Sequence, residues 1–246
     1  MSPDAGSDAD SFRGITCSAP PARSRWMRDL VVRHVPPGPA PRILDLGCGT
    51  GSLVLELASA LEGSSITGID VSGANIVAAR LRSAALRPQR HMAFEETDYL
   101  VYEAGPFDVI VSDGVLHLVP GSTDALVAKL ARDLRPGGVL VCAMPYDCTY
   151  NRVFSFVRRL LRVVRSPATD ALILAAGRAL HGREMDDAGL RERIHYMYIP
   201  PVRVENESFL EVARAAGLRA TGRYPVRSVS VSQLRHRVTV FEKEVR

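Results

Sequence analysis

One stretch of ten residues, Arg42 to Gly51, constrains the fold of this chain of 246 residues more than any other. It reads RILDLGCGTG, a short apolar run followed by three glycines at alternate positions. Such a run is typical of a parallel strand buried on both faces, and the apolar pattern after Gly51 predicts a helix. The glycines let the backbone turn sharply and leave N–H groups at the helix start open to a ligand. The stretch therefore predicts strand, glycine turn and helix, an arrangement used by plain turns and nucleotide sites alike.

Two acidic residues near the glycine turn favour a nucleotide site. Asp45 lies two residues before the first glycine, and Asp70 ends the next apolar run, nineteen residues after Gly51. A carboxylate at the end of a second strand can accept hydrogen bonds from both hydroxyls of a ribose. Asp70 suits any cofactor that carries a ribose, so the spacing of the glycines has to separate the candidates.

The spacing D-x-G-x-G-x-G resembles motif I of the class I S-adenosylmethionine-dependent methyltransferases, whereas a dinucleotide site would show G-x-G-x-x-G. The resemblance covers residues 42 to about 144 closely and the C-terminal forty residues loosely. It implies S-adenosyl-L-methionine as the cofactor. It also implies an α/β fold with a doubly wound, seven-stranded, mostly parallel sheet of the Rossmann-like type.

Strands and helices alternate along the chain as a parallel, doubly wound sheet requires. We divide the chain into a tail with a cap helix (1–41), a cofactor-binding core (42–144), a helical cap inserted after strand five (145–205), and a C-terminal helix with closing strands (206–246). We expect strands at 43–46, 66–69, 91–96, 107–112 and 139–143, and a closing antiparallel hairpin of 218–224 and 238–241. We expect helices at 22–35, 73–86, 123–134 and 208–216, with Ser72 and Ser122 as N-caps.

The inserted residues contain a basic amphipathic helix at 151–165. Its apolar side chains fall on one half of the helical wheel and its five arginines on the other. We expect a lid whose apolar face packs on the core while the arginines meet solvent. Two alternatives stay open, a peripheral contact with anionic membrane lipid through residues 151–165 and a dimer contact. A second helix is expected at 167–180, and residues 196–201 are expected to be extended.

The resemblance implies roles for residues that follow the strands. Asp45 would orient the glycine turn and the ammonium group of the cofactor, although a carboxylate that only caps local N–H groups is equally consistent. Asp98 would accept from the adenine amino group, with Tyr99 or Phe94 over the ring, and the alternative for Asp98 is the N-cap of a short helix. Arg25, on the first helix, is a candidate partner for the cofactor carboxylate. The expected cofactor-binding residues are Asp45, Gly47, Cys48, Gly49, Gly51, Asp70, Val71, Asp98, Tyr99, Ser112 and Asp113.

His117 is the strongest candidate for a catalytic residue. It lies three residues past Gly114, at the carboxyl end of the sheet, where ligands bind in open α/β folds. A neutral imidazole there could accept a proton from a hydroxyl or an amine, and a packed, structural histidine is the alternative. Aromatic side chains near the insertion could line a substrate pocket or belong to the core. The candidates for substrate binding are Trp26, Tyr146, Tyr150 and Tyr196.

Composition and charge argue against several other classes of protein. Residues 1–10 lack the apolar core of a signal peptide, and no apolar run approaches the roughly 20 residues of a membrane-spanning helix. The four cysteines form no C-x-x-C pair, so we expect reduced thiols, a cytoplasmic location and no metal site. Residues 42–150 hold 8 basic and 13 acidic side chains, whereas residues 151–204 hold 10 and 5. The basic part lacks the interleaved aromatic residues of a nucleic-acid interface, so we expect no nucleic-acid partner and leave the oligomeric state open.

Together these patterns predict transfer of a methyl group from S-adenosylmethionine to an O, N or C atom of a small apolar or aromatic metabolite. A closed site beneath the inserted helices is the reason to prefer a compact acceptor to a macromolecule. One alternative is methylation of a membrane-dissolved lipid or quinone. The other is a cofactor-binding protein that does not methylate, such as a cyclase or a partner subunit.

Overall fold

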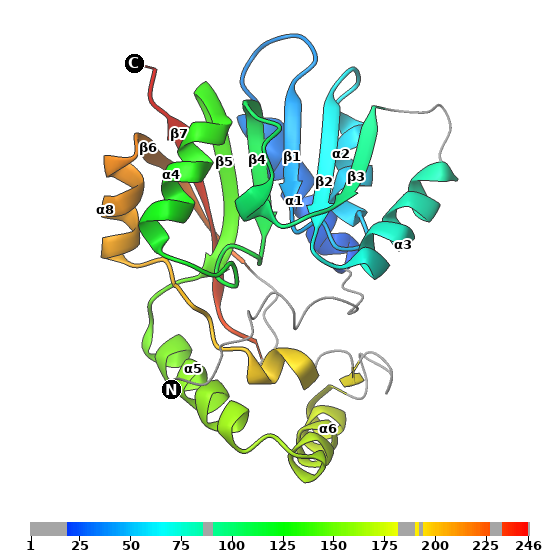
Figure 1. Ribbon diagram of the computed structural model, residues 1–246, viewed down its shortest axis with the longest axis vertical. Helices are drawn as coiled ribbons and strands as arrows, with labels where there is room; N and C mark the ends of the chain where they lie inside the picture. Colours follow the sequence, from blue (N-terminus) through cyan, green and yellow to red (C-terminus); the bar gives the residue numbers. More distant parts are fainter. Residues whose placement is uncertain (1–18, 86–90, 182–189, 192–193, 227–232, 246) are drawn as a thin grey trace.

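A computed structural model of the chain describes residues 19–85, 91–181, 190–191, 194–226 and 233–245 (Figure 1). Its centre is a sheet of seven strands: β1 (Arg42–Leu46), β2 (Ser65–Asp70), β3 (Met92–Glu96), β4 (Phe107–Asp113), β5 (Leu134–Pro145), β6 (Leu218–Pro225) and β7 (His236–Lys243). The strand order is β3-β2-β1-β4-β5-β7-β6. Strands β1 to β5 are parallel, and β7 is antiparallel to both of its neighbours. The doubly wound, mostly parallel sheet expected from the sequence is confirmed.

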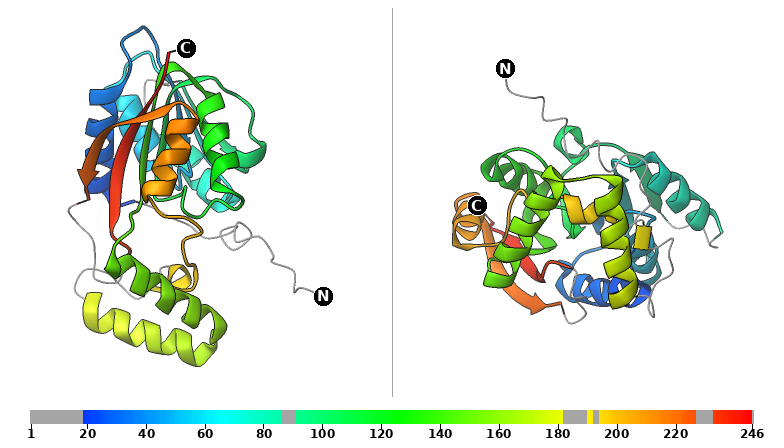
Figure 2. Two further views of the ribbon diagram at one scale, coloured as in Figure 1. Left: turned by 90° about the vertical axis from the view of Figure 1, so that its left-hand side faces the viewer. Right: turned by 90° about the horizontal axis from the view of Figure 1, so that it is seen from below.

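Helices cover both faces of the sheet (Figures 1 and 2). On one face, α1 (Pro21–His34), α2 (Ser52–Ala60) and α3 (Gly73–Ala84) contribute to one apolar core. On the other face, α4 (Thr123–Asp133) and α8 (Glu207–Ala215) contribute to a second core. Strands β1, β4 and β5 lie between the two cores and are almost fully buried. This double burial is the physical reason that β1 reads as a continuous apolar run.

Serine side chains begin two of these helices, as the sequence predicted. The Ser72 Oγ accepts a hydrogen bond from the Asn75 N–H at 3.4 Å, and the Ser122 Oγ accepts one from the Ala125 N–H at 3.1 Å. Each cap satisfies an N–H group that has no partner within its own helix.

The closing hairpin returns the chain to the functional edge of the sheet. Because β7 is antiparallel to β5, it begins where β5 ends, and His236 pairs with Pro145. The sequence predicted the hairpin, and the structure adds that the first residue of β7, His236, lies at the carboxyl-terminal edge of the parallel strands. That edge is where ligands bind in open α/β folds.

Three helical segments follow β5 and lie beyond the same edge (Figures 1 and 2). They are α5 (Thr149–Val163), α6 (Pro167–His181) and the 3₁₀ helix η3 (His195–Tyr198). The expectation of an extended tract at 196–201 is therefore wrong over its first three residues. None of the helices in the described residues is long and apolar enough to cross a membrane.

The side of α5 that faces the protein differs from the one expected, although four of the five arginines in residues 151–165 are exposed as predicted. Its buried residues are Asn151, Ser155 and Arg158, whereas its apolar face meets solvent. Polar partners explain the difference: the Asn151 amide donates to the carbonyls of Tyr146 and Arg235, at 2.7 and 2.8 Å, and accepts from the Arg235 N–H. The prediction of an apolar lid face packed on the core, with Arg158 in solvent, is wrong.

Candidate active site

The glycine turn between β1 and α2 has a backbone that only glycine adopts readily. Gly47, Gly49 and Gly51 have φ angles of 76°, 52° and 78°. A Cβ at Gly47 would overlap the Val115 side chain, and one at Gly51 would lie 2.8 Å from the Phe94 ring. Both the conformation and the packing therefore require glycine in this turn.

Hydrogen bonds hold the turn against β2. The N–H groups of Gly47 and Cys48 both donate to the Ile69 carbonyl, at 2.8 and 2.9 Å. The Cys48 side chain is buried, and a Cβ added to Gly68 would lie 2.9 Å from its sulfur. Cys48 thus contributes to the turn through its backbone and through packing.

Asp70 connects the glycine turn to the start of α3. One of its carboxylate oxygens accepts from the Gly49 N–H at 2.9 Å. The other accepts from the Ser72 N–H at 2.9 Å and the Asn75 amide at 3.2 Å. The predicted ribose ligand therefore lies beside the turn, and half-buried Val71 follows it.

Asp45 is a buried carboxylate with one oxygen that has no hydrogen-bond partner. Its side chain is 2% exposed, and the unpartnered atom is Oδ2. Burial, and after it the negative charges of Asp113 and Asp70, raise the pKa of Asp45 to about 8. A buried carboxylate without a partner is unfavourable, and a cationic ligand group beside it would relieve that cost.

Arg23, on α1, reaches across to the end of β4. Its Nε and Nη2 atoms donate to the Asp113 carboxylate, at 2.9 and 2.6 Å, and its guanidinium lies 4.9 Å from the centre of the Trp26 ring. Arg25, the arginine expected from the sequence to bind the cofactor carboxylate, is exposed. Helical periodicity contained the signal, because Arg23 lies four residues before buried Met27 and shares its face.

Three buried polar atoms at or beside the carboxyl ends of β1 and β4 have no hydrogen-bond partner. Besides Asp45 Oδ2, they are the buried Nη1 of Arg23 and the buried Oγ of Ser112, which neighbours Asp113 at the end of β4. A Cβ at Gly114, the next residue, would meet no atom within 4 Å, so space is open there. An anion, a cation and a hydroxyl partner would together satisfy this set, which suits the amino-acid end of S-adenosylmethionine.

His117 is buried in the loop after β4, beside a second histidine that the sequence analysis missed. Its ring centre lies 5.3 Å from that of His236, edge to face. Burial, then the positive charges of His236, Arg158 and Arg203, lower the pKa of His117 well below 6.5. The imidazole of His117 is therefore neutral at neutral pH, and its Nδ1 has no partner.

His236 presents one ring nitrogen as an acceptor. Its Nδ1 lies 2.8 Å from the Leu234 carbonyl, and because a carbonyl only accepts, Nδ1 carries the proton and Nε2 does not. Burial lowers the pKa of His236. The negative charge of Asp113 partly opposes this effect, and the positive charge of Arg23 adds to it. His236 reaches the site because β7 pairs antiparallel with β5, and no local sequence motif predicts that position.

Two buried arginines border the histidines. Arg203 donates to the carbonyls of Leu116 and Val119, both at 2.6 Å, and so fixes the loop that carries His117. Arg158 donates to the Ile199 carbonyl at 3.2 Å, and burial lowers its pKa to about 10. The Nε atoms of both arginines are buried without a partner.

Asp98 and Tyr99 occupy different environments. The Asp98 carboxylate accepts from the Leu100 N–H at 2.9 Å and begins a short 3₁₀ helix, η2 (Tyr99–Val101), so the N-cap alternative is observed. Tyr99 is buried in the core, its hydroxyl donates to Asp133 at 3.0 Å, and the Lys129 ammonium lies 4.8 Å from its ring centre. No face of the Tyr99 ring is open to an adenine, so its predicted role is not supported.

The predicted substrate aromatics are half-buried and come from four segments: Trp26 from α1, Tyr146 from the end of β5, Tyr150 from α5 and Tyr196 from η3. Arginines at the start of β7 cover two of them. The Arg237 guanidinium lies 4.4 Å from the Tyr146 ring centre, and that of Arg235 lies 4.7 Å from Tyr150. These contacts bring Tyr146 and Tyr150 to the side of the site where His236 lies.

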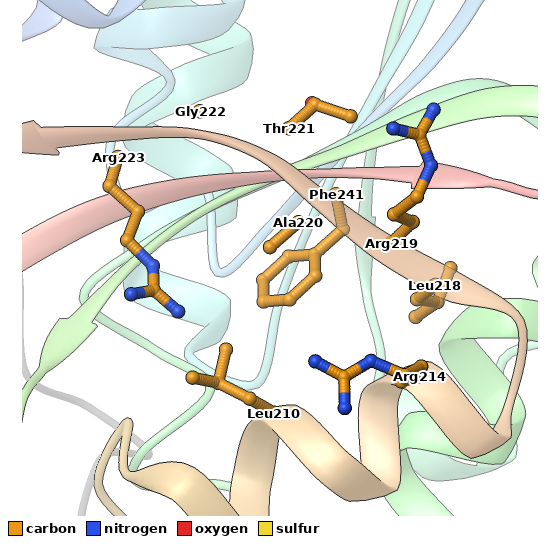
Figure 3. A pocket seen from close by; sticks show the side chains of 9 residues that line it. All are labelled: Leu210, Arg214, Leu218, Arg219, Ala220, Thr221, Gly222, Arg223 and Phe241. Carbon is orange, nitrogen blue, oxygen red and sulfur yellow. The ribbon is translucent and has the colours of Figure 1, made fainter.

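A surface groove of about 350 Å³ lies elsewhere, between α8 and β6 (Figure 3). Arg219 and Arg223 on its wall form ion pairs with Glu242 at 3.2 Å and Glu205 at 3.7 Å. None of the residues described above lines this groove. We therefore place the candidate active site at the glycine turn.

Known proteins are similar to this chain in sequence and in fold. A family described as a methyltransferase domain matches residues 44–140. The trans-aconitate 2-methyltransferase of Streptomyces coelicolor is 30% identical over 212 residues, which are 80% of this chain and 67% of that protein. The trans-aconitate 2-methyltransferase of Deinococcus radiodurans is 36% identical over 124 residues, 50% of this chain and 45% of that protein. The chain thus spans about half the length of this second relative. The magnesium protoporphyrin IX methyltransferase of Synechocystis PCC 6803, solved with bound SAH, has a TM-score of 0.61 at 16% identity over 91% of this chain and 83% of that chain.

The chain belongs to the class I S-adenosylmethionine-dependent methyltransferases. S-adenosylmethionine is the cofactor of this family. Both findings confirm what the D-x-G-x-G-x-G spacing predicted.

Proposed function

We propose that this chain transfers a methyl group from S-adenosylmethionine to a small acceptor held between the carboxyl edge of the sheet and the helices that follow β5. The observation that carries the proposal is the set of unpartnered atoms at or beside the carboxyl ends of β1 and β4. Arg23 Nη1 offers a donor for a carboxylate, and Asp45 Oδ2 offers an acceptor for an ammonium group. An amino acid carries both groups, and S-adenosylmethionine ends in one.

The remaining cofactor contacts follow from position. Asp70 would accept from ribose hydroxyls, and Asp98 from the adenine amino group, with its second oxygen. The turn residues Gly47, Cys48, Gly49 and Gly51 offer backbone N–H groups, and Val71, Ser112 and Asp113 border the same edge. Bound there, S-adenosylmethionine supplies an electrophilic methyl group, and the protein has to align an acceptor with it.

Two histidines border the proposed acceptor site, and either could accept a proton from the acceptor molecule. His117 is buried and neutral, and His236 presents Nε2 as an acceptor. A neutral imidazole is able to remove a proton from a hydroxyl or an amine as a bond to carbon forms. We assign the base to His117 and a supporting contact to His236.

The acceptor we propose is a small molecule with an apolar or aromatic body and one anionic group. Trp26 and Tyr146 offer rings for the body, whereas the Tyr150 ring is stacked on Phe154, with 5.6 Å between ring centres, and meets Arg235. The buried Nε of Arg158 is a donor without a partner, and a carboxylate or phenolate would satisfy it. The trans-aconitate enzymes among the relatives are named for an anionic substrate, which supports the same choice.

A labelling experiment tests the proposal. The protein is incubated with methyl-labelled S-adenosylmethionine and a cell extract, which is then separated into small-molecule, lipid, protein and nucleic-acid fractions. We expect label in the small-molecule fraction. An anion-exchange resin should retain the unmethylated acceptor, and it should also retain the labelled product if that product carries a second charged group. Label in macromolecules would contradict the proposed acceptor class. Measurable cofactor binding without label in any fraction would contradict methyl transfer itself and favour a non-methylating role.

A further inference from the structure

The outer face of α5 is apolar and open to solvent. We call the six side chains that form it the apolar strip, and each is between 37% and 83% exposed. At 100° per residue they fall within about 120° of the helical wheel, so they form one continuous surface. The strip consists of Val153, Phe156, Val157, Leu160, Val163 and Val164.

The neighbouring helix also exposes apolar side chains. Leu172 and Leu180 of α6 are 69% and 63% exposed, and several alanines of α6 are exposed with them. In two views at right angles, α5 and α6 form the outermost layer at one end of the molecule (Figure 2). Large contiguous apolar surfaces of this kind mark a site of contact with another phase or protein.

Charge identifies the partner. Residues 149–181 contain six arginines and one acidic residue, Asp170, whose carboxylate accepts from the Tyr198 hydroxyl. Arg159 is exposed on the helical wheel directly beside the strip, and exposed Arg162 lies further round. An amphipathic helix with apolar residues on one face and arginines at its border is typical of a segment that lies in the surface of an anionic bilayer.

We infer that α5 and α6 dock this protein on an anionic membrane surface, with the apolar strip among the acyl chains and the exposed Arg159 and Arg162 at the headgroups. Docking in this way would break no contact of the inward-facing polar residues of α5, because Asn151 and Arg158 have their hydrogen-bond partners on the protein side. A second copy of the chain suits the surface less well. A symmetric contact through α5 would bring two strongly basic helices together, and like charges repel.

The test is co-sedimentation of the full chain with vesicles of phosphatidylcholine alone or mixed with phosphatidylglycerol. We expect binding to the mixed vesicles, weakened by added salt, and little binding to neutral vesicles. Phe156→Glu and Leu160→Glu should each lower the partition coefficient about tenfold or more, since each removes apolar burial and adds a repelled charge. Leu81→Glu, on exposed α3, is the matched control and should retain most of the binding.

Calorimetric affinity for S-adenosylmethionine reports folding of each variant and should stay unchanged, because the strip lies outside the cofactor site. Wild-type protein that ignores anionic vesicles would overturn the inference. So would equal losses in Phe156→Glu and Leu81→Glu. A dimer in light scattering that Phe156→Glu converts to monomer, without vesicle binding, would assign the surface to a second copy instead.

Discussion

Arg23 and Asp113 form a bidentate ion pair, 2.6 Å at its shortest, that joins α1 to the carboxyl end of β4. Both side chains are mostly buried, so the pair fixes the position of α1 over the edge of the sheet where the glycine turn lies. The remaining nitrogen of Arg23, Nη1, is left without a partner. The ion pair therefore holds a buried nitrogen without a partner near the carboxyl end of β4.

Replacement of Arg23 should weaken cofactor binding more than it weakens the fold. We expect Arg23→Gln to lower affinity for S-adenosylmethionine by about 1.5–3 kcal/mol, the scale of a charge-assisted hydrogen bond. Isothermal titration calorimetry measures this change. Arg25→Gln, an exposed arginine on the same helix, is the control and should bind normally. Equal affinities in the two variants would remove Arg23 from the site.

Asp45→Asn should stabilise the protein at neutral and mildly basic pH. The pKa of this carboxyl is ordinarily 3.8 and is about 8 here, so between these values the unfolded chain releases a proton that the folded chain keeps. Wild-type stability therefore falls as pH rises through this window, and asparagine removes the loss. We expect a Tm higher by about 2–4 °C at pH 8 for each kcal/mol gained, and no gain near pH 4. The same gain at both pH values would contradict the raised pKa.

Cofactor binding should release a proton through the same residue. An ammonium group beside Asp45 favours its ionised form, so affinity should rise as pH increases toward about 8. Calorimetry at pH 7 in two buffers of different ionisation enthalpy measures the proton released. Asp45→Asn should abolish the difference between buffers. A difference that persists in this variant would point to another group.

Asp70→Ala should weaken cofactor binding by about 1.5–3 kcal/mol, since its carboxylate is the proposed ribose ligand. It should also destabilise the fold, because Asp70 accepts from the Gly49 and Ser72 N–H groups. Ser72→Ala separates the two effects: it removes the α3 cap, at a cost of about 0.5–2 kcal/mol, and leaves Asp70 in place. If Ser72→Ala weakened cofactor binding as much as Asp70→Ala, the loss would report stability alone.

His117→Asn should lower kcat by about 10²-fold or more while S-adenosylmethionine affinity stays within error. Because the pKa of His117 lies well below 6.5, wild-type kcat at saturating S-adenosylmethionine should be flat between pH 6.5 and 8 and should fall only in more acidic solution. His236→Asn is the matched variant, and its smaller expected loss reflects a supporting contact. A loss below tenfold in His117→Asn would leave this residue a structural role. If His236→Asn lost more activity than His117→Asn, the role of base would be assigned to His236 instead.

The cofactor half of the fold was predictable because its determinants are local. The run before Gly47 and the serine N-caps each specify an element through neighbours in sequence. Asp45 and Asp70 follow from the same short motif, and both lie at the turn. Sequence separation was the limit elsewhere, since Arg23 meets Asp113 ninety residues away.

The errors have a common physical cause. An amphipathic pattern alone predicts apolar residues inside, but Asn151 bonds to Arg235, 84 residues later, and this contact accompanies burial of Asn151, Ser155 and Arg158 in place of the apolar face. Tyr99 was placed from its neighbour Asp98, yet the partner that directs it is Asp133 on α4. Neither distant partner is visible in a local pattern.

The three carboxylates at the turn, Asp45, Asp70 and Asp113, also bear on how a catalytic cycle would restart. Arg23 balances the charge of Asp113 only, and Asp45 adds a further negative charge when it ionises beside a bound ammonium group, so this edge of the sheet attracts positive charge. S-adenosylmethionine carries one more positive charge than the S-adenosylhomocysteine left after methyl transfer. We therefore expect the same acidic edge to hold the spent product less tightly than the donor, and this difference favours exchange of the product for a new donor molecule.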